Sequence, residues 1–108
     1  MNDSLPDSSG SVVFVVYNEL FHTRVMDMLR RVGIDYYTRW GPVTGKGRGT
    51  EPHLGQGAYG STNAVLMIAF QESAPLQALI EAMQAINQQT TRADDRMRLF
   101  QVPLVRTV

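Results

Sequence analysis

Residues 11–17 read SVVFVVY, an unbroken run of β-branched and aromatic residues. A run this short and this rich in valine is typical of a strand rather than a helix. From Val12 onward all its residues are apolar, so a strand here is apolar on both faces. Residues 62–70, TNAVLMIAF, repeat this pattern. Two strands that are apolar on both faces predict the buried centre of a sheet.

The segments around these two strands complete an alternating order of strands and helices. Apolar residues at three- and four-residue steps predict one helix over 20–32, ended by Gly33. They predict a second helix that begins with an N-cap at residues 73–75 and ends near Gln89. Alternation over 34–40 and the run 97–105 predict the second and fourth strands. The order βαββαβ predicts an α+β fold, the ferredoxin-like sandwich, with an antiparallel sheet, two helices on one face and strand order 4-1-3-2.

The predicted sheet has one face that the helices do not cover. Antiparallel sheets usually alternate apolar and polar residues when one face is wet, but the two central strands do not. The chain has no further segment to cover that face, so the pattern predicts self-association through it. Pro103 favours an edge position for the fourth strand, because proline cannot donate a ladder hydrogen bond.

Length and composition limit the possible classes of protein. The chain has 108 residues, enough for one domain, and its ten basic and ten acidic side chains argue against nucleic acid or an anionic membrane as partners. It has no cysteine, and its longest apolar runs are too short for membrane insertion. Residues 1–10 lack the features of a signal peptide. We expect a cytoplasmic protein with a flexible tail over 1–10 and a single domain over 11–108.

The segment 42–61, PVTGKGRGTEPHLGQGAYGS, is predicted to be a long loop between strands two and three. Seven of the nine glycines lie within residues 41–61. Loops of this length in a compact domain usually have a function. The loop contains the run Gly45, Lys46, Gly47, Arg48 and Gly49.

That glycine-rich run is chemically suited to an anion. Glycine lets backbone N–H groups approach phosphate closely, and Lys46 and Arg48 would add charge-assisted hydrogen bonds. It fits neither a Walker loop nor a dinucleotide fingerprint. A solvated hairpin tip is the alternative interpretation of the same residues.

Arginines cluster around the fourth strand, at Arg92, Arg96, Arg98 and Arg106. They are either solvent-facing charges that protect an edge strand or part of an anion site completed at the base of the glycine-rich loop. The spacing does not distinguish these two interpretations.

Evidence for a metal site or a catalytic site is weaker. His53 and Glu51 lie in the loop, and His22 lies in the first helix, without the spacing of a metal motif. The sequence has no GxSxG motif and no cysteine nucleophile. We therefore expect a protein that is not an enzyme.

The element order, the long glycine-rich excursion and the apolar sheet face together resemble the PII signal-transduction superfamily, over residues 12–105. Gly45, Lys46, Gly47 and Arg48 match the GxGR motif that opens the T-loop of that family. The resemblance implies a homotrimer whose sheets face the threefold axis. It also implies adenine nucleotides bound between subunits, and a mobile loop that contacts partner proteins.

The sequence also departs from regular PII proteins. Gly49 follows Arg48 where they have glutamine, residues 90–96 (TTRADDR) replace a glycine-rich, lysine-containing B-loop, and the chain stops at Val108 without their C-terminal extension. These differences are typical of divergent PII-like proteins that accompany transporters. With Arg96 in place of the B-loop lysine, the resemblance implies a sensor of ATP, ADP or AMP with no required cofactor.

The predicted nucleotide-binding residues are therefore the following: Gly45, Lys46, Gly47, Arg48, Gly49, Arg92 and Arg96. The expected partner is a transporter or a metabolic enzyme, contacted through the loop 42–61. A second hypothesis is a metal-responsive trimer similar to divalent-cation tolerance proteins, with Glu51 and His53 as ligands. A small enzyme on the same widespread fold is a third hypothesis, without a catalytic constellation to support it.

Overall fold

The computed structural model describes residues 10–46 and 62–108. Within these ranges the elements follow the predicted order, which confirms the ferredoxin-like fold. The strands are β1 (Ser11–Asn18), β2 (Thr38–Val43), β3 (Asn63–Phe70) and β4 (Arg98–Pro103), the helices are α1 (His22–Arg31) and α2 (Ser73–Gln88), and the short 3-10 turns are η1 (Glu19–Phe21) and η2 (Ala93–Asp95).

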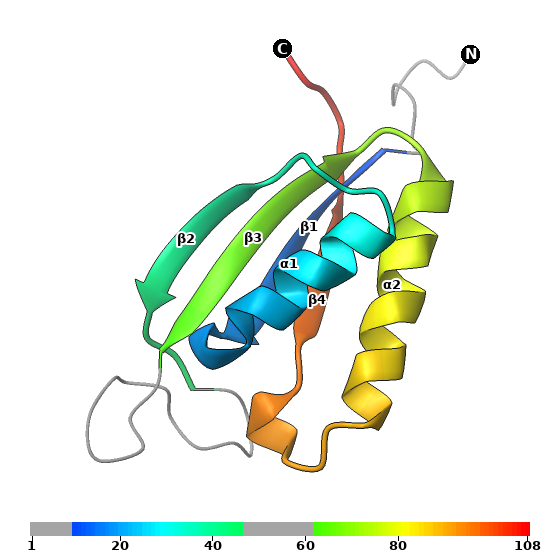
Figure 1. Ribbon diagram of the computed structural model, residues 1–108. Coiled ribbons are helices and arrows are strands. Elements are labelled where there is room, and N and C mark those ends of the chain that lie inside the picture. The colour runs from blue at the N-terminus through cyan, green and yellow to red at the C-terminus, as the bar shows by residue number, and fades with distance from the viewer. Residues whose placement is uncertain (1–9, 47–61) are drawn as a thin grey trace.

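The four strands form one antiparallel sheet in the order β2-β3-β1-β4. This is the predicted order, with the two valine-rich strands in the middle. Figure 1 shows both helices on the same face of the sheet. Pro103 lies in the edge strand β4, opposite Ser11, as its missing N–H group predicts.

The hydrophobic core lies between the helices and the sheet. The strands contribute alternate residues to it because successive side chains of a strand point to opposite faces. The helices contribute one apolar stripe each. The largest fully buried side chains are Val13, Val15, Tyr17, Leu66, Ile68 and Phe70 from the sheet and Val25, Met28, Leu29 and Leu79 from the helices.

Helix α1 ends at Arg31, and Gly33, two residues later, stops it as the sequence predicts. Gly33 has φ of 79°, a conformation that costs glycine little. The N–H group of Gly33 donates to the Arg30 carbonyl (3.2 Å), and that of Ile34 donates to the Leu29 carbonyl (2.9 Å). This pair of hydrogen bonds is a Schellman motif, and it turns the chain back toward the sheet.

The predicted bounds of the second strand are wrong. The prediction placed this strand at 34–40 and began the loop at Pro42, because glycine and proline usually break a strand. In the structure β2 begins at Thr38 and passes through Gly41 and Pro42, joined by a cis peptide bond, to Val43. An edge strand tolerates this sequence, since one side of it has no ladder partner. Residues 47–61 of the predicted loop lie outside the described residues.

Residues 1–9 of the predicted tail also lie outside the described residues. Gly10 is buried, and its carbonyl accepts a hydrogen bond from the N–H group of Leu104 (3.1 Å). Within the described part of the chain, neither helix is long and apolar enough to cross a membrane.

The face of the sheet away from the helices is apolar, and we call it the open sheet face. Directly opposed residues in the strand pairs share a face, which assigns its members. Three of its large side chains are exposed: Trp40 (47%), Phe100 (55%) and Val102 (44%). The other apolar members are Val12, Phe14, Val16, Val65, Met67 and Ala69.

Candidate functional site

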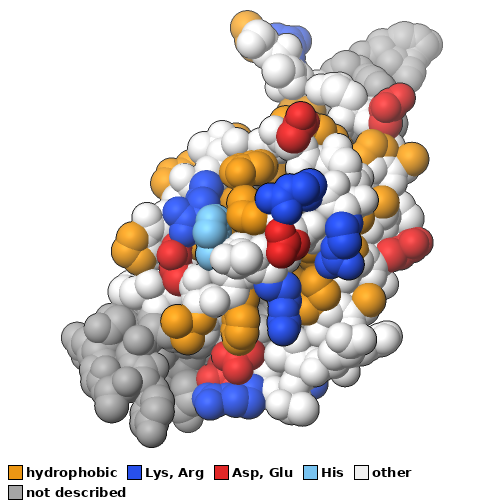
Figure 2. Space-filling view, viewed as in Figure 1, with side chains coloured by type: hydrophobic (Ala, Val, Ile, Leu, Met, Phe, Trp, Pro, Cys, Tyr) orange, Lys and Arg blue, Asp and Glu red, His pale blue; other side chains and the backbone are white. Residues whose placement is uncertain are grey.

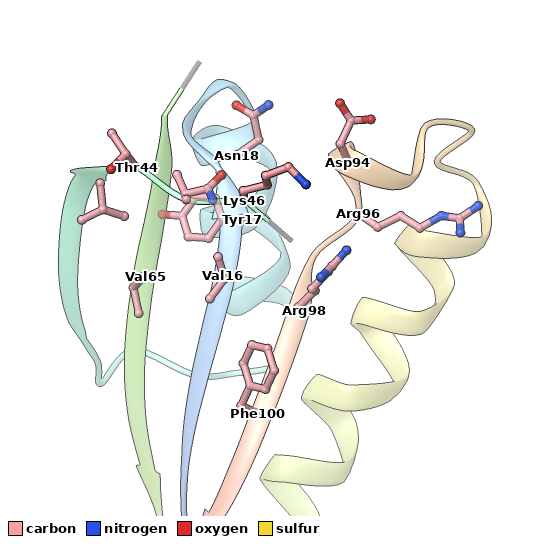
Figure 3. A pocket seen from close by; sticks show the side chains of 13 residues that line it. Val16, Tyr17, Asn18, Thr44, Lys46, Val65, Asp94, Arg96, Arg98 and Phe100 are labelled. Atoms are coloured by element: carbon pink, nitrogen blue, oxygen red, sulfur yellow. The ribbon is translucent and has the colours of Figure 1, made fainter. Parts of the chain in front are cut away.

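A hollow of about 320 Å³ lies where β1 ends and β4 begins, and we call it the strand-end hollow (Figure 3). Five segments meet there: the end of β1, the end of β2 with the residues that follow it, the start of β3, the turn η2 and the start of β4. Its lining residues are Val16, Tyr17, Asn18, Val43, Thr44, Gly45, Lys46, Asn63, Val65, Asp94, Arg96, Arg98 and Phe100.

One wall of the hollow is apolar and belongs to the open sheet face. Val16 is paired with Val65 on one side and with Arg98 on the other. Phe100 follows Arg98 on the same face of β4. This arrangement gives a flat apolar surface of the kind on which an aromatic ring can pack.

Cationic side chains border that apolar wall. Figure 3 shows Lys46 and Arg98 extending into the space between β1 and η2. Lys46 is the only lysine of the chain. Arg96 also lines the hollow, but its Nε donates to the Thr90 carbonyl (3.2 Å), which directs its guanidinium toward the end of α2.

Arg92 does not line the hollow. Its guanidinium pairs with Asp94 (2.9 Å) and lies 3.8 Å from Asp95. Asp94 does line the hollow, and its carboxylate is largely shielded from solvent. Arg92 therefore acts on the site through Asp94, whose negative charge it partly neutralises.

Two asparagines complete the polar side of the hollow. Asn18 is buried, and its side-chain oxygen accepts a hydrogen bond from the N–H group of Leu20 (2.9 Å), which caps η1. Asn63 lies opposite Asn18 in the β1–β3 pair. A Cβ on Gly45 would come within 3.3 Å of the Asn63 amide nitrogen, so glycine lets the backbone after β2 pass close to β3.

A buried polar network lies beside the hollow, around the Tyr17 hydroxyl. That hydroxyl accepts from Nε of Arg39 (3.2 Å) and lies 2.9 Å from Nδ1 of His22. Arg39 also forms an ion pair with Glu19. Burial raises the pKa of Tyr17, and the hydrogen bond from Arg39 opposes that shift; the same hydrogen bond raises the pKa of Arg39.

Of the predicted nucleotide-binding residues, the structure brings Gly45, Lys46 and Arg96 together and leaves Arg92 to one side. Gly47, Arg48 and Gly49 lie outside the described residues, as do Glu51 and His53 of the metal hypothesis. In residues 10–46 and 62–108, no three histidine or acidic side chains are grouped as metal ligands would be.

Sequence reasoning did not single out Phe100, Asn18 or Asn63, and it left Arg98 between two interpretations. The available signal was the strand register. Once β1 is paired with β4, the position opposite Val16 is Arg98, and this places an arginine beside the glycine-rich segment.

No family model matches the sequence. A search of curated proteins also found no match.

Solved structures do match the fold. The CPII protein of Thiomonas intermedia K12, bound to ADP and bicarbonate, aligns with a TM-score of 0.63 at 16% identity, over 90% of this chain and 89% of that one. The B. subtilis GlnK–ATP complex aligns with a TM-score of 0.67 at 15% identity, over 95% and 88%. A PII-like signalling protein of Thermus thermophilus aligns with a TM-score of 0.52 at 16% identity, over 89% of each chain. The chain therefore has the ferredoxin-like fold of the PII-like proteins.

Proposed function

We propose that this chain is a PII-like regulatory sensor that binds an adenine nucleotide in the strand-end hollow. One observation carries the proposal. Lys46 and Arg98 border an apolar wall at the base of the glycine-rich segment. The wall, with Val16 and Phe100, is suited to a base, and the two cations are suited to phosphate oxygens.

The ligands of similar structures support the choice of nucleotide. The CPII protein is bound to ADP in one structure and to ADP and AMP in another, and the B. subtilis GlnK is bound to ATP. We propose the same class of ligand here. Gly45 would supply its backbone N–H group, and Arg96 would supply charge near the outer rim of the hollow.

The size of the hollow favours a site shared between subunits. Its volume of about 320 Å³ lies at the lower end of the usual range for small-molecule pockets. A second copy of the chain would supply the remaining wall, and the open sheet face gives it an apolar surface to pack on. We propose a homotrimer, formed by the single domain over 11–108 in the cytoplasm.

We propose that nucleotide binding changes the conformation of the segment 42–61, and that a partner protein detects this change. A nucleotide that binds only one state of this segment shifts the population by its difference in affinity for the two states. The partner would be a transporter or a metabolic enzyme that distinguishes these states. No chemical step is required of the chain, which we propose is not an enzyme.

Isothermal titration calorimetry with ADP, ATP and AMP tests the assignment of residues. We expect Lys46→Ala and Arg98→Ala each to weaken binding by about tenfold, because each removes one charge-assisted contact. The control is Arg106→Ala, an exposed arginine that does not line the hollow, and it should bind like the wild type. Wild-type affinity in both Lys46→Ala and Arg98→Ala would refute this site.

A further inference from the structure

The outward side of α1 carries a stripe of positive charge. Arg24 and Arg31 are seven residues apart, so they lie on the same side of the helix, separated by about 10 Å along its axis. Both are exposed. Arg30 is exposed beside them and is paired with Asp27 (2.7 Å), so the stripe keeps an excess of two positive charges.

Arg24 and Arg31 form one wall of a groove between the two helices, which we call the α1–α2 groove. Its volume is about 320 Å³. The opposite wall, formed by α2, is mainly apolar, because small and apolar side chains recur there at helical spacing. This wall consists of Ala82, Ala85, Ile86 and Gln89.

No ion pair involves Arg24 or Arg31 within residues 10–46 and 62–108, although Asp27 lines a neighbouring hollow together with both. The Arg24 guanidinium lies 5.5 Å from the centre of the Phe21 ring, a cation–π contact that positions the side chain without cancelling its charge. In the described part of the chain, Arg31 has no acidic partner. Asp27 is engaged by Arg30, and Glu81 accepts from Gln77 (3.2 Å) without lining the groove.

The shape and charge of the groove indicate the chemistry of its occupant. Two guanidinium groups bind carboxylates or phosphates best, through charge-assisted hydrogen bonds. Nucleic acid is a poor fit, because the chain has no net charge and the positive region is confined to one helix. A phosphate backbone would leave the apolar α2 wall without an apolar partner, whereas the apolar stripe of a helix would cover it.

We infer that the α1–α2 groove docks an acidic amphipathic helix of a partner protein. Its carboxylates, one heptad apart, pair with Arg24 and Arg31, and its apolar stripe packs on Ala82, Ala85 and Ile86. Figure 2 views this helical side of the molecule, where basic side chains lie among apolar and some acidic ones. The open sheet face lies on the opposite side, so docking and self-association do not compete (Figure 1).

The test uses the full chain, labelled with ¹⁵N, and a synthetic helical peptide with glutamates one heptad apart beside a leucine stripe. We expect the amide resonances of Arg31, Ala85 and Gln89 to shift on titration. The Arg24→Glu/Arg31→Glu double variant should bind the peptide at least about tenfold more weakly, because two attractive pairs become repulsive. Ala85→Trp should also weaken binding, since it fills the groove at an exposed position without changing the charge.

Arg106→Glu is the control: it reverses one arginine charge, half the change of the double variant, at an exposed site away from the groove. Several outcomes would overturn the inference: no shift in the groove amides, an equal loss of affinity in Arg106→Glu, or equal binding of a peptide whose leucines are replaced by serine. Two results together would indicate a membrane surface instead. The wild type would bind phosphatidylserine vesicles while the double variant does not, and the peptide would shift no groove amide. None of these readouts involves a nucleotide, so they are independent of the strand-end hollow.

Discussion

The Tyr17 side chain is 1% exposed, yet its hydroxyl lies within hydrogen-bond distance of two other side chains. Arg39 donates to it from β2, and His22 approaches it from the start of α1. Glu19 then pairs with Arg39, so one buried network joins β1, β2 and α1 next to the strand-end hollow. None of these four residues follows a sequence motif, because the partners are brought together by the pairing of strands rather than by spacing along the chain.

The raised pKa of Tyr17 predicts a loss of stability at high pH. Burial disfavours the tyrosinate, so the folded protein retains the phenolic proton at pH values where the unfolded chain loses it. The contribution of Tyr17 to the free energy of unfolding is therefore complete below about pH 10, and it is lost as the pH rises through the pKa of Tyr17 in the folded state. We expect the free energy of unfolding, measured with urea, to fall above this pH.

Tyr17→Phe should remove this part of the decline. It should also cost about 1 kcal/mol at neutral pH, because it removes the hydroxyl's hydrogen bonds. The two proteins differ only in this hydroxyl, so the comparison isolates Tyr17. Parallel pH profiles of the two proteins would contradict the assignment.

Gly41 predicts a second effect at the scale of one residue. A Cβ at this position would overlap the Glu19 carboxylate and lie 3.2 Å from the Ala64 Cβ. We expect Gly41→Ala to lower the free energy of unfolding by about 0.5–1 kcal/mol, because the Glu19 carboxylate must move and its partly exposed ion pair with Arg39 is displaced. Urea denaturation measures the change.

A double-mutant cycle separates crowding from any other effect at Gly41. In a Glu19→Ala background the carboxylate is gone, so Gly41→Ala should cost less than in the wild type. An equal cost in both backgrounds would show that the Glu19 carboxylate is not what excludes a side chain here.

At the scale of the elements, the sequence predicted what depends on local patterns. The unbroken apolar runs of β1 and β3, the helical stripes and the left-handed Gly33 were all visible, and each is confirmed. The predicted bounds of β2 were wrong because an edge strand is paired on only one side. Gly41 and Pro42 cause an irregularity in the register with β3, between Trp40 and Val43, but the strand continues to Val43. Pairing with β3, which no local pattern reports, decides where this strand begins and ends.

The connection between α2 and β4 depends on Asn87, which the sequence did not indicate. Its side-chain amide donates to the Met97 carbonyl (2.8 Å), and its side-chain oxygen accepts from the Met97 N–H group (2.9 Å). These two bonds fix the start of β4 and the position of η2, which contributes Asp94 to the strand-end hollow. An asparagine near a helix end has no sequence signature that distinguishes this clamp from a surface residue.

We expect Asn87→Ala to destabilise the fold by about 1–3 kcal/mol, because it leaves two backbone groups of the buried Met97 without partners. Gln88→Ala, at the exposed neighbouring position, is the control and should change the free energy of unfolding by only a few tenths of a kcal/mol. Urea denaturation of the three proteins gives the comparison. Equal stability of Asn87→Ala and the control would mean that the clamp contributes nothing.

At the scale of the whole molecule, the two sides of the sheet differ in what covers them. The helices bury one side, while Trp40, Phe100 and Val102 are exposed on the other. The sequence predicted this open apolar face from the double-sided strands alone. It could not predict the strand-end hollow, because the hollow forms only where five segments converge.

The open sheet face predicts that one charge placed in it will dissociate the assembly. We expect Val102→Glu to convert the proposed trimer to monomers, because Val102 lies opposite Val12 on the open sheet face and each buried carboxylate would lose its hydration among apolar neighbours. Light scattering after size-exclusion chromatography measures the mass. Leu20→Glu is the control, since Leu20 is more exposed (77%) but lies outside the sheet and should leave the mass unchanged. A wild type that is already monomeric would contradict the role of this face.

The most direct test of the central claim is calorimetric titration of the unmodified full-length protein with ADP, with and without magnesium, beside a series of divalent metals alone. A nucleotide sensor built around Lys46 and Arg98 should give saturable binding at one nucleotide per chain. The same ligand should raise the thermal midpoint in proportion to the logarithm of its concentration above the dissociation constant. No saturable binding of ADP, ATP or AMP at millimolar concentration, together with a response to a metal alone, would contradict the nucleotide assignment and favour the metal hypothesis with Glu51 and His53.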